Sequence, residues 1–129
     1  MTEAAHIDFA GIRIGHWTDE LHHTGCTVFL CPDGTYGSVD ARGPAPGSRE
    51  LALLAPDKPE DKQVNAIVLT GGSAFGLATA DGVMRYLAER GIGHQTPIVP
   101  VPIVPAAVVF DIAFSEGKFY PDAESGYAA

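Results

Sequence analysis

The sequence predicts a mixed α/β fold, and the stretch from Val64 to Gly91 provides the main evidence. It opens with a short apolar run rich in β-branched side chains, which is typical of a strand buried on both faces. Two glycines, Gly71 and Gly72, then allow a tight turn. Apolar residues recur at helical spacing after the turn, which predicts a helix over residues 74–90 that stops at Gly91.

Ser73 stands between this turn and the predicted helix. Its side chain is expected to cap the helix by accepting a hydrogen bond from an otherwise unpaired amide. Charged residues at intervals of four are expected to pair along one helix face. These residues are Asp81, Arg85 and Glu89.

The glycine turn also raises the question of a phosphate site, because the amides at a helix N-terminus favour anions. The spacing argues against one. A dinucleotide site needs Gly-x-Gly-x-x-Gly, Ser73 stands in place of the second glycine, and no P-loop lysine follows. Two interpretations of Gly71, Gly72 and Ser73 therefore stay open. The turn either lets the helix pack closely on the sheet, or it binds a carbonyl oxygen or an oxyanion.

Length and composition indicate a single domain over residues 1–129 with one core. Hydrophobic residues make up 46% of the chain and charged residues 19%, as in an ordinary globular protein. The net charge of −8 disfavours nucleic acid and anionic membranes as partners. No apolar run approaches the roughly 20 residues of a membrane span, and the acidic start lacks a signal-peptide core, so we expect a cytoplasmic protein.

Three strands are predicted before the central stretch, at residues 9–17, 26–31 and 35–40. The sequence Pro32-Asp33-Gly34 favours a turn, because proline presets its backbone angle and glycine accepts a positive φ. Residues 24–40 are therefore expected to form a β-hairpin.

Residues 40–50 are rich in glycine and proline and are expected to form an ordered loop. Its charged members are expected to face solvent. These members are Arg42, Arg49 and Glu50. A charged turn interrupted by proline is expected over residues 56–62.

Prolines recur in the segment after the helix, at Pro97, Pro100, Pro102 and Pro105. Proline excludes a helix and a central ladder position, and the intervening Ile and Val favour burial. We therefore predict an extended buried segment, followed by a short strand over residues 107–110. A turn and a short strand are expected over residues 115–120, and Asp122 is expected to cap a helix at the end of the chain.

The sequence predicts no metal site and no cofactor. Cys26 and Cys31 lie five positions apart on one predicted strand, so their side chains point to opposite faces and are expected in the core, not in a disulfide. His22 and His23 have no third ligand at metal spacing and are expected on the surface. A Gly-x-Ser-x-Gly nucleophile elbow is also absent from the sequence.

Three blocks occur in order: VNAIVLTGGSAFGLATADGVMRYLAERGIG, VPIVPAAVVFDI and YPDAESGYAA. Together with the segment from Ile12 to Glu50, they resemble the DmpA/P1 family of N-terminal nucleophile hydrolases, which is peptidase family S58. That family includes L-aminopeptidase/D-esterases, β-peptidyl aminopeptidases and the nylon-oligomer hydrolase. The resemblance covers nearly the whole chain.

The resemblance implies a DmpA-like α/β/β/α sandwich, made from a precursor that cleaves itself once. Cleavage exposes a Ser or Thr at the start of the downstream chain; its hydroxyl is the nucleophile, and its own α-amine can serve as the base. This chain matches the upstream (alpha) part only. We therefore expect it to be inactive alone and to require a downstream (beta) chain. The resemblance further implies a homo-oligomer of such units and small amide, ester or peptide substrates.

The resemblance also assigns site positions, two of which depart from the family pattern. Phe110 matches the tyrosine that helps to hold the oxyanion, and the loss of such a donor typically costs roughly 3 kcal/mol. Val108 matches the glutamate with which the aminopeptidase branch reads the substrate amine, which argues against a standard aminopeptidase and leaves room for amides without a free amine.

The remaining expected site residues are Gly71, Gly72 and Ser73, near the active cleft, and Asp111, which either orients a neighbour or closes a turn. Two other functions stay open. The chain could be a catalytically disabled family member that serves as a structural or binding subunit, or part of a related acyltransferase.

Overall fold

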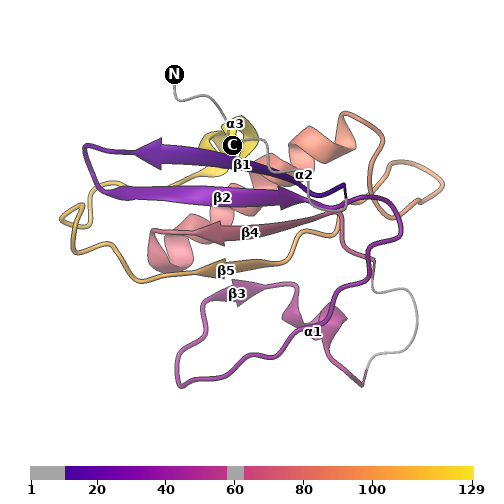
Figure 1. Cartoon of the computed structure of the whole chain (residues 1–129), viewed down its shortest axis with the longest axis horizontal. Coiled ribbons are helices and arrows are strands. Elements are labelled where there is room, and N and C mark those ends of the chain that lie inside the picture. The colour runs from indigo at the N-terminus through magenta and orange to yellow at the C-terminus, as the bar shows by residue number, and fades with distance from the viewer. Residues whose placement is uncertain (1–10, 58–62) are drawn as a thin grey trace.

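One mixed β-sheet carries helices on a single face (Figure 1). The computed structural model describes residues 11–57 and 63–129. Its strands are β1 (Arg13–Asp19), β2 (Thr24–Leu30), β3 (Ser48–Arg49), β4 (Ala66–Thr70) and β5 (Ala106–Val108). Its helices are α1 (Leu51–Leu54), the 3₁₀ helix η1 (Ser73–Ala78), α2 (Thr79–Ala88) and α3 (Ala123–Ala128).

The sheet has the strand order β1-β2-β4-β5-β3. Antiparallel pairs join β1 to β2, β2 to β4, and β3 to β5, whereas β4 and β5 are parallel. The parallel pair is connected through η1 and α2, because parallel neighbours need a long crossover. The mixed α/β fold predicted from the sequence is confirmed.

The core lies between the sheet and α2. Side chains from alternate positions of β2 and β4 meet one stripe of the helix. The buried members are Val28, Ala66, Val68, Ala80, Val83, Leu87, Val104 and Ala106.

Helix α3 packs closely on α2, backbone against backbone. Gly82 of α2 lies against the carbonyl of Ala123, and Gly126 of α3 lies against the carbonyl of Thr79. Arg85 adds two hydrogen bonds of 2.9 Å to the carboxylate of Glu124.

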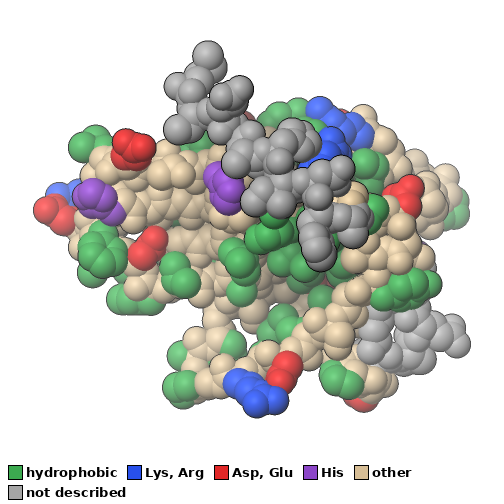
Figure 2. Space-filling model, in the orientation of Figure 1, with side chains coloured by type: hydrophobic (Ala, Val, Ile, Leu, Met, Phe, Trp, Pro, Cys, Tyr) green, Lys and Arg blue, Asp and Glu red, His purple; other side chains and the backbone are tan. Residues whose placement is uncertain are grey.

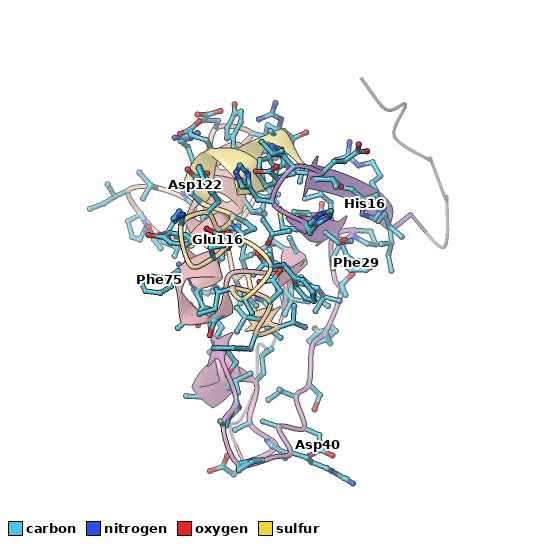
Figure 3. The ribbon with its side chains drawn as sticks, turned by 90° about the vertical axis from the view of Figure 1, so that its left-hand side faces the viewer. His16, Phe29, Asp40, Phe75, Glu116 and Asp122 are labelled. Atoms are coloured by element: carbon cyan, nitrogen blue, oxygen red, sulfur yellow. The ribbon has the colours of Figure 1, made fainter. Side chains whose placement is uncertain are left out.

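The opposite face of the sheet is not covered by any helix of the described residues. On β4, Ile67 is 39% exposed and Leu69 is 48% exposed. Figure 3 shows His16 and Phe29 on this face, on the side of the sheet away from α2. The prediction of a strand buried on both faces is therefore wrong for the described residues, and we call this surface the bare face.

The predicted hairpin over residues 24–40 is also wrong. β2 pairs with β1 across a short turn and with β4 on its other side, so neither edge of β2 is free for residues 35–40. These residues form a loop in which Tyr36 makes an isolated bridge to Gln63. The turn at Pro32-Asp33-Gly34 is present, with the amide of Thr35 3.2 Å from the carbonyl of Pro32. The first strand begins later than predicted, and Phe9 and Ala10 lie outside the described residues.

The long helix begins differently from the prediction. Its first part is the 3₁₀ helix η1, and the residue before it is Gly72, in the left-handed region at φ 83°. The capping role predicted for Ser73 is wrong, because Ser73 is itself the first residue of η1 and has φ 52°. The predicted end is confirmed. The amide of Gly91 donates to the carbonyl of Ala88, and the amide of Ile92 donates to the carbonyl of Leu87. Both hydrogen bonds are 3.0 Å long, as in a Schellman motif.

The three charged residues expected to pair along the helix form their side-chain hydrogen bonds with other segments. Asp81 accepts a 2.6 Å hydrogen bond from Arg49 of β3, and Glu89 accepts one of 2.7 Å from the hydroxyl of Tyr127. The prediction that Arg49 is a solvated surface residue is therefore wrong. The side chain of Arg42 is exposed as predicted and pairs with Asp40 on the loop.

The proline-rich segment is buried in its second half only. Pro102, Val104 and Pro105 are buried, whereas Ile98 is 89% exposed. The strand that follows, β5, begins one residue earlier and ends two residues earlier than predicted. Residues 115–120 form turns without the predicted strand, and of the turn expected over residues 56–62 only Pro56 and Asp57 are described.

Cys26 and Cys31 are both free thiols. Within residues 11–57 and 63–129, none of the helices has the length and apolar character needed to span a bilayer.

The cap predicted at Asp122 is confirmed. Its carboxylate accepts a 2.9 Å hydrogen bond from the amide of Ser125, whose hydroxyl lies 3.3 Å from the amide of Asp122 in a capping box. The bond from the Ser125 amide holds the pKa of the Asp122 carboxyl below its ordinary value of 3.8.

Replacement of Asp122 by alanine should lower the free energy of unfolding by about 1 kcal/mol at pH 7. Because the pKa of Asp122 is lower in the folded state, the contribution of its charge is present above the ordinary pKa of 3.8 and is lost as the pH falls through the folded value. Urea unfolding at pH 7 and at acidic pH measures the difference. Asp122→Asn is the control, since an uncharged cap should differ from alanine by the same amount at both pH values. A pH-independent effect of Asp122→Ala would contradict the role of the charge.

Candidate active site

A broad open trough lies on the bare face, at the end of the sheet where β4 and β5 finish. Its cavity volume is about 790 Å³, within the range of small-molecule sites. It is lined by the end of β1, the start of β2, the end of β4 and the end of β5 with the residue that follows it, including Thr27, Leu69, Ala107 and Val109. Its polar lining residues include Asp19, Glu20, His23, Thr24 and Asp111.

Asp111, which lines the trough, joins three segments. Its Oδ2 atom accepts a 2.8 Å hydrogen bond from the hydroxyl of Thr24, and its Oδ1 atom accepts one of 2.6 Å from the amide of Gly72. Gly71 lies so close that a Cβ atom there would overlap the carboxylate of Asp111 and the hydroxyl of Thr24. The Asp111 side chain therefore both orients a neighbouring hydroxyl and closes the glycine turn. We call this arrangement the Asp111 clasp.

The amides of the glycine turn all donate to protein acceptors. Gly71 donates to the carbonyl of Gly25 at 2.9 Å, Ser73 donates to that of Val109 at 3.0 Å, and Gly72 donates to Asp111. In this arrangement they hold β2, β5 and η1 together. The geometry thus favours the interpretation that the turn packs the helix closely on the sheet.

The two positions that depart from the family pattern flank the trough. Val108 borders it, but the Val108 side chain lies against Gly47, beside β3. Phe110 is 75% exposed and is not among the residues that line the trough. Val109, which lies between them, contributes to the trough wall. The catalytic and substrate-binding roles of Phe110 and Val108 stay predictions.

Aromatic and histidine side chains surround the same end of the sheet, which faces the viewer in Figure 3. His22 stacks on Phe119 with ring centroids 3.5 Å apart, and Phe75 stacks on Tyr120 at 4.7 Å. His22 Nδ1 is also 2.7 Å from Asp19 Oδ2, and this hydrogen bond lowers the pKa of Asp19.

The described residues offer little nucleophilic chemistry in the trough. Burial raises the pKa of Cys26 to about 11, so its thiol is protonated at neutral pH and inert. His16 Nδ1 and Thr27 Oγ1 are 2.9 Å apart, but they are cross-strand partners on β1 and β2, a pairing that commonly stabilises sheets. In residues 11–57 and 63–129, no group of three or more His, Cys, Asp or Glu could hold a metal ion.

The sequence pattern of Peptidase family S58 matches residues 5–121. The chain belongs to this family. A mycobacterial relative of this S58 chain, named as an uncharacterized aminopeptidase of Mycobacterium tuberculosis, is 46% identical over 95% of the chain. The corresponding protein of Mycobacterium leprae is 45% identical over 95% of the chain.

A third relative of the S58 chain is the 6-aminohexanoate-oligomer endohydrolase of Paenarthrobacter ureafaciens, which is 35% identical over 98% of the chain. The matched region makes up 38% of the M. tuberculosis protein, 36% of the M. leprae protein and 33% of the endohydrolase. The S58 chain thus spans between 33% and 38% of the length of these relatives.

Thr24 of the S58 chain, like Asp19, Glu20 and His23, lines the candidate site but was not predicted from the sequence. It lies 87 positions from Asp111, and neither its neighbours nor its spacing distinguishes it from other threonines that begin strands. The contact exists only because β2 and β4 are neighbours, which places the start of β2 beside the glycine turn.

Proposed function

We propose that this chain is the upstream portion of a self-processing N-terminal nucleophile hydrolase that acts on amide or ester bonds. A downstream segment would supply the second sheet of a DmpA-like α/β/β/α sandwich, together with the Ser or Thr nucleophile. The observation that carries the proposal is the bare apolar face beside the trough, in a chain that belongs to peptidase family S58.

The composition of β4 supports a cover on the bare face. A strand of continuous apolar residues is typical of a sheet buried on both sides, and β4 has the sequence AIVLT. Ile67 and Leu69 project from it, with Phe29 of β2 directly opposite Ile67. A second sheet packed face to face at about 10 Å would remove these side chains from water.

The trough is where we place the reacting atoms. It lies on the bare face, so a residue carried by the covering segment can reach it, and the Asp111 clasp gives it a fixed edge. With Phe110 in place of tyrosine, the oxyanion would need another donor, for example one on the downstream segment. With Val108 in place of glutamate, the site suits amides that lack a free amine. The named activity of the Paenarthrobacter relative, hydrolysis of a 6-aminohexanoate oligomer, supports an amide substrate.

The complete polypeptide tests the proposal. Mass spectrometry of the purified protein should find two fragments, the second beginning with Ser or Thr, and the processed protein should hydrolyse a chromogenic amide. Alanine in place of that Ser or Thr should abolish both cleavage and turnover, while a serine-to-threonine or threonine-to-serine exchange should retain part of each. A precursor that stays intact and yet hydrolyses the amide would overturn the proposal.

The same assay separates the two other functions. Cleavage without turnover of any amide or ester would favour a disabled subunit, in which Phe110 has removed the oxyanion donor. Transfer of the acyl group to added amines in preference to water would identify an acyltransferase. We also propose that several such units assemble into a homo-oligomer and that the protein is cytoplasmic.

A further inference from the structure

One row of side chains crosses β1, β2, β4 and β5 on the bare face and lines the trough. In the strand register, His16 lies opposite Thr27, Thr27 lies opposite Leu69, and Leu69 lies beside Ala107. All four residues line the trough. Figure 2 looks onto this face, where hydrophobic side chains gather over the strands. His16 and Thr27 are therefore the polar members of a row that continues with apolar side chains.

The His16–Thr27 pair leaves one hydrogen-bond donor free. Nδ1 of His16 lies 2.9 Å from Oγ1 of Thr27. If the ring donates from Nδ1, the hydroxyl proton of Thr27 is free. If Thr27 donates to Nδ1, the single proton of a neutral imidazole is on Nε2 and is free there. Because neither side chain has another hydrogen-bond partner in the described part of the chain, the pair offers one N–H or O–H to the trough in either tautomer.

The other hydroxyls of the trough differ from this pair. Those of Thr24 and Thr70 each donate to another group of the protein. Thr18 forms no side-chain hydrogen bond within residues 11–57 and 63–129, so no contact there fixes the direction of its hydroxyl. A donor that is fixed before the reaction stabilises a developing charge better than one that must first be ordered. The His16–Thr27 pair is preorganised in this sense, and Thr18 is not.

The charges around the trough make such a donor necessary for a reaction that passes through an oxyanion. The acidic members of the lining are Asp19, Glu20 and Asp111, and no Lys or Arg of the described residues lines the trough. Carboxylates disfavour a further negative charge on a nearby oxygen. A hydrogen bond from this chain offsets part of that cost if it is aimed at the oxygen where the charge develops.

We propose that the His16–Thr27 pair donates a hydrogen bond to the carbonyl oxygen of the amide substrate and stabilises that oxygen as it gains charge. This inference rests on the proposed hydrolase function, and it assigns to this chain an oxyanion donor of its own. In that reaction, the hydroxyl oxygen of the nucleophile bonds to the carbonyl carbon, its proton passes to the α-amine, and the C=O electron pair moves onto the carbonyl oxygen. Collapse re-forms the C=O bond, breaks the C–N bond and returns the proton to the leaving nitrogen.

Kinetics of the complete, processed protein on a chromogenic amide test this donor. Thr27→Val keeps the shape of the side chain but removes the hydroxyl. Its kcat per processed molecule should fall about a hundredfold or more with little change in KM, because the hydrogen bond strengthens only as charge develops. Thr27→Ser keeps the hydroxyl and should restore most of the rate. Thr18→Val is the matched control, since it removes a hydroxyl from the same trough and should leave kcat close to that of the wild type.

A double-mutant cycle gives a second measurement that does not depend on Thr27→Val alone. His16→Ala should lower kcat about as much as Thr27→Val, and the double variant should lose no more than either single variant, because the two residues act as one unit. The melting temperature and the fraction of processed protein should stay near those of the wild type. A pair that only stabilises the sheet would instead lower the melting temperature and leave kcat per processed molecule unchanged.

The outcomes separate this inference from the function on which it rests. If the wild type hydrolyses the amide and Thr27→Val does so equally fast, the inference is overturned and the proposed function stands. Losses that multiply in the double variant would also overturn the inference, because the two residues would then act independently. A wild type that neither cleaves itself nor hydrolyses any amide would overturn both.

Discussion

Ile67→Asp should prevent the complete protein from forming a stable, processed enzyme. Ile67 projects from the bare face of β4 and is only 39% exposed even without a cover. If a second sheet packs on this face, the aspartate becomes an unpaired charge between two apolar layers, at a cost of about 4 kcal/mol or more. That is a large share of the stability of a typical domain. Yield, melting temperature and the fraction of processed protein measure the effect.

Leu21→Asp is the control for the same chemical change in water. Leu21 is 80% exposed in the turn between β1 and β2, so the substitution should leave processing and stability close to those of the wild type. Ile67 is preferable to Leu69 as the test position because Leu69 lines the trough and Ile67 does not. If Ile67→Asp behaves like Leu21→Asp, then the face stays in water in the complete protein, and the sandwich is not formed there.

Asp111→Ala should be the second most damaging change, because it removes the acceptor of two hydrogen bonds at once. The hydroxyl of Thr24 and the amide of Gly72 both donate to this carboxylate, and the loss should cost about 2 to 3 kcal/mol of folding free energy. The glycine turn would lose its fixed position at the edge of the trough. We therefore expect a fall in kcat in addition to a lower melting temperature.

Two further variants separate the clasp from a general effect of charge. Asp111→Asn keeps one oxygen acceptor and should retain part of the stability and activity. Glu20→Ala removes another carboxylate from the same trough, and this one is exposed, so its effect on stability should be small. If the Asp111→Ala protein is as stable and as active as the Glu20→Ala protein, then the two hydrogen bonds of the Asp111 clasp contribute to neither stability nor activity.

The mixed fold and several local features followed from the sequence alone. The run from Ala66 to Thr70 is a strand, the double glycine is a turn, Gly91 ends the helix segment and Asp122 caps α3. Each of these depends on residues within a few positions of one another, through β-branched side chains, positive φ angles or a local capping bond. Near neighbours suffice to determine such features.

Strand partners and distant contacts were beyond the reach of local patterns. Residues 35–40 form no strand because β4 occupies the edge of β2 that they would need. Arg49 pairs with Asp81, and Thr24 with Asp111, across 32 and 87 positions of sequence. Whether such groups meet depends on the order of strands in the sheet, which is a property of the whole chain.

The bare face separates most clearly what the sequence determines from what the tertiary structure determines. The sequence of β4 by itself determined that both of its faces are apolar, because Ala, Ile, Val and Leu leave no polar side to turn toward water. Only the tertiary structure decided which face α2 covers, and it left the other with Ile67 and Leu69 exposed. The reason is physical: side-chain alternation sets what each face is made of, whereas the crossover from β4 through α2 to β5 sets which face becomes the core.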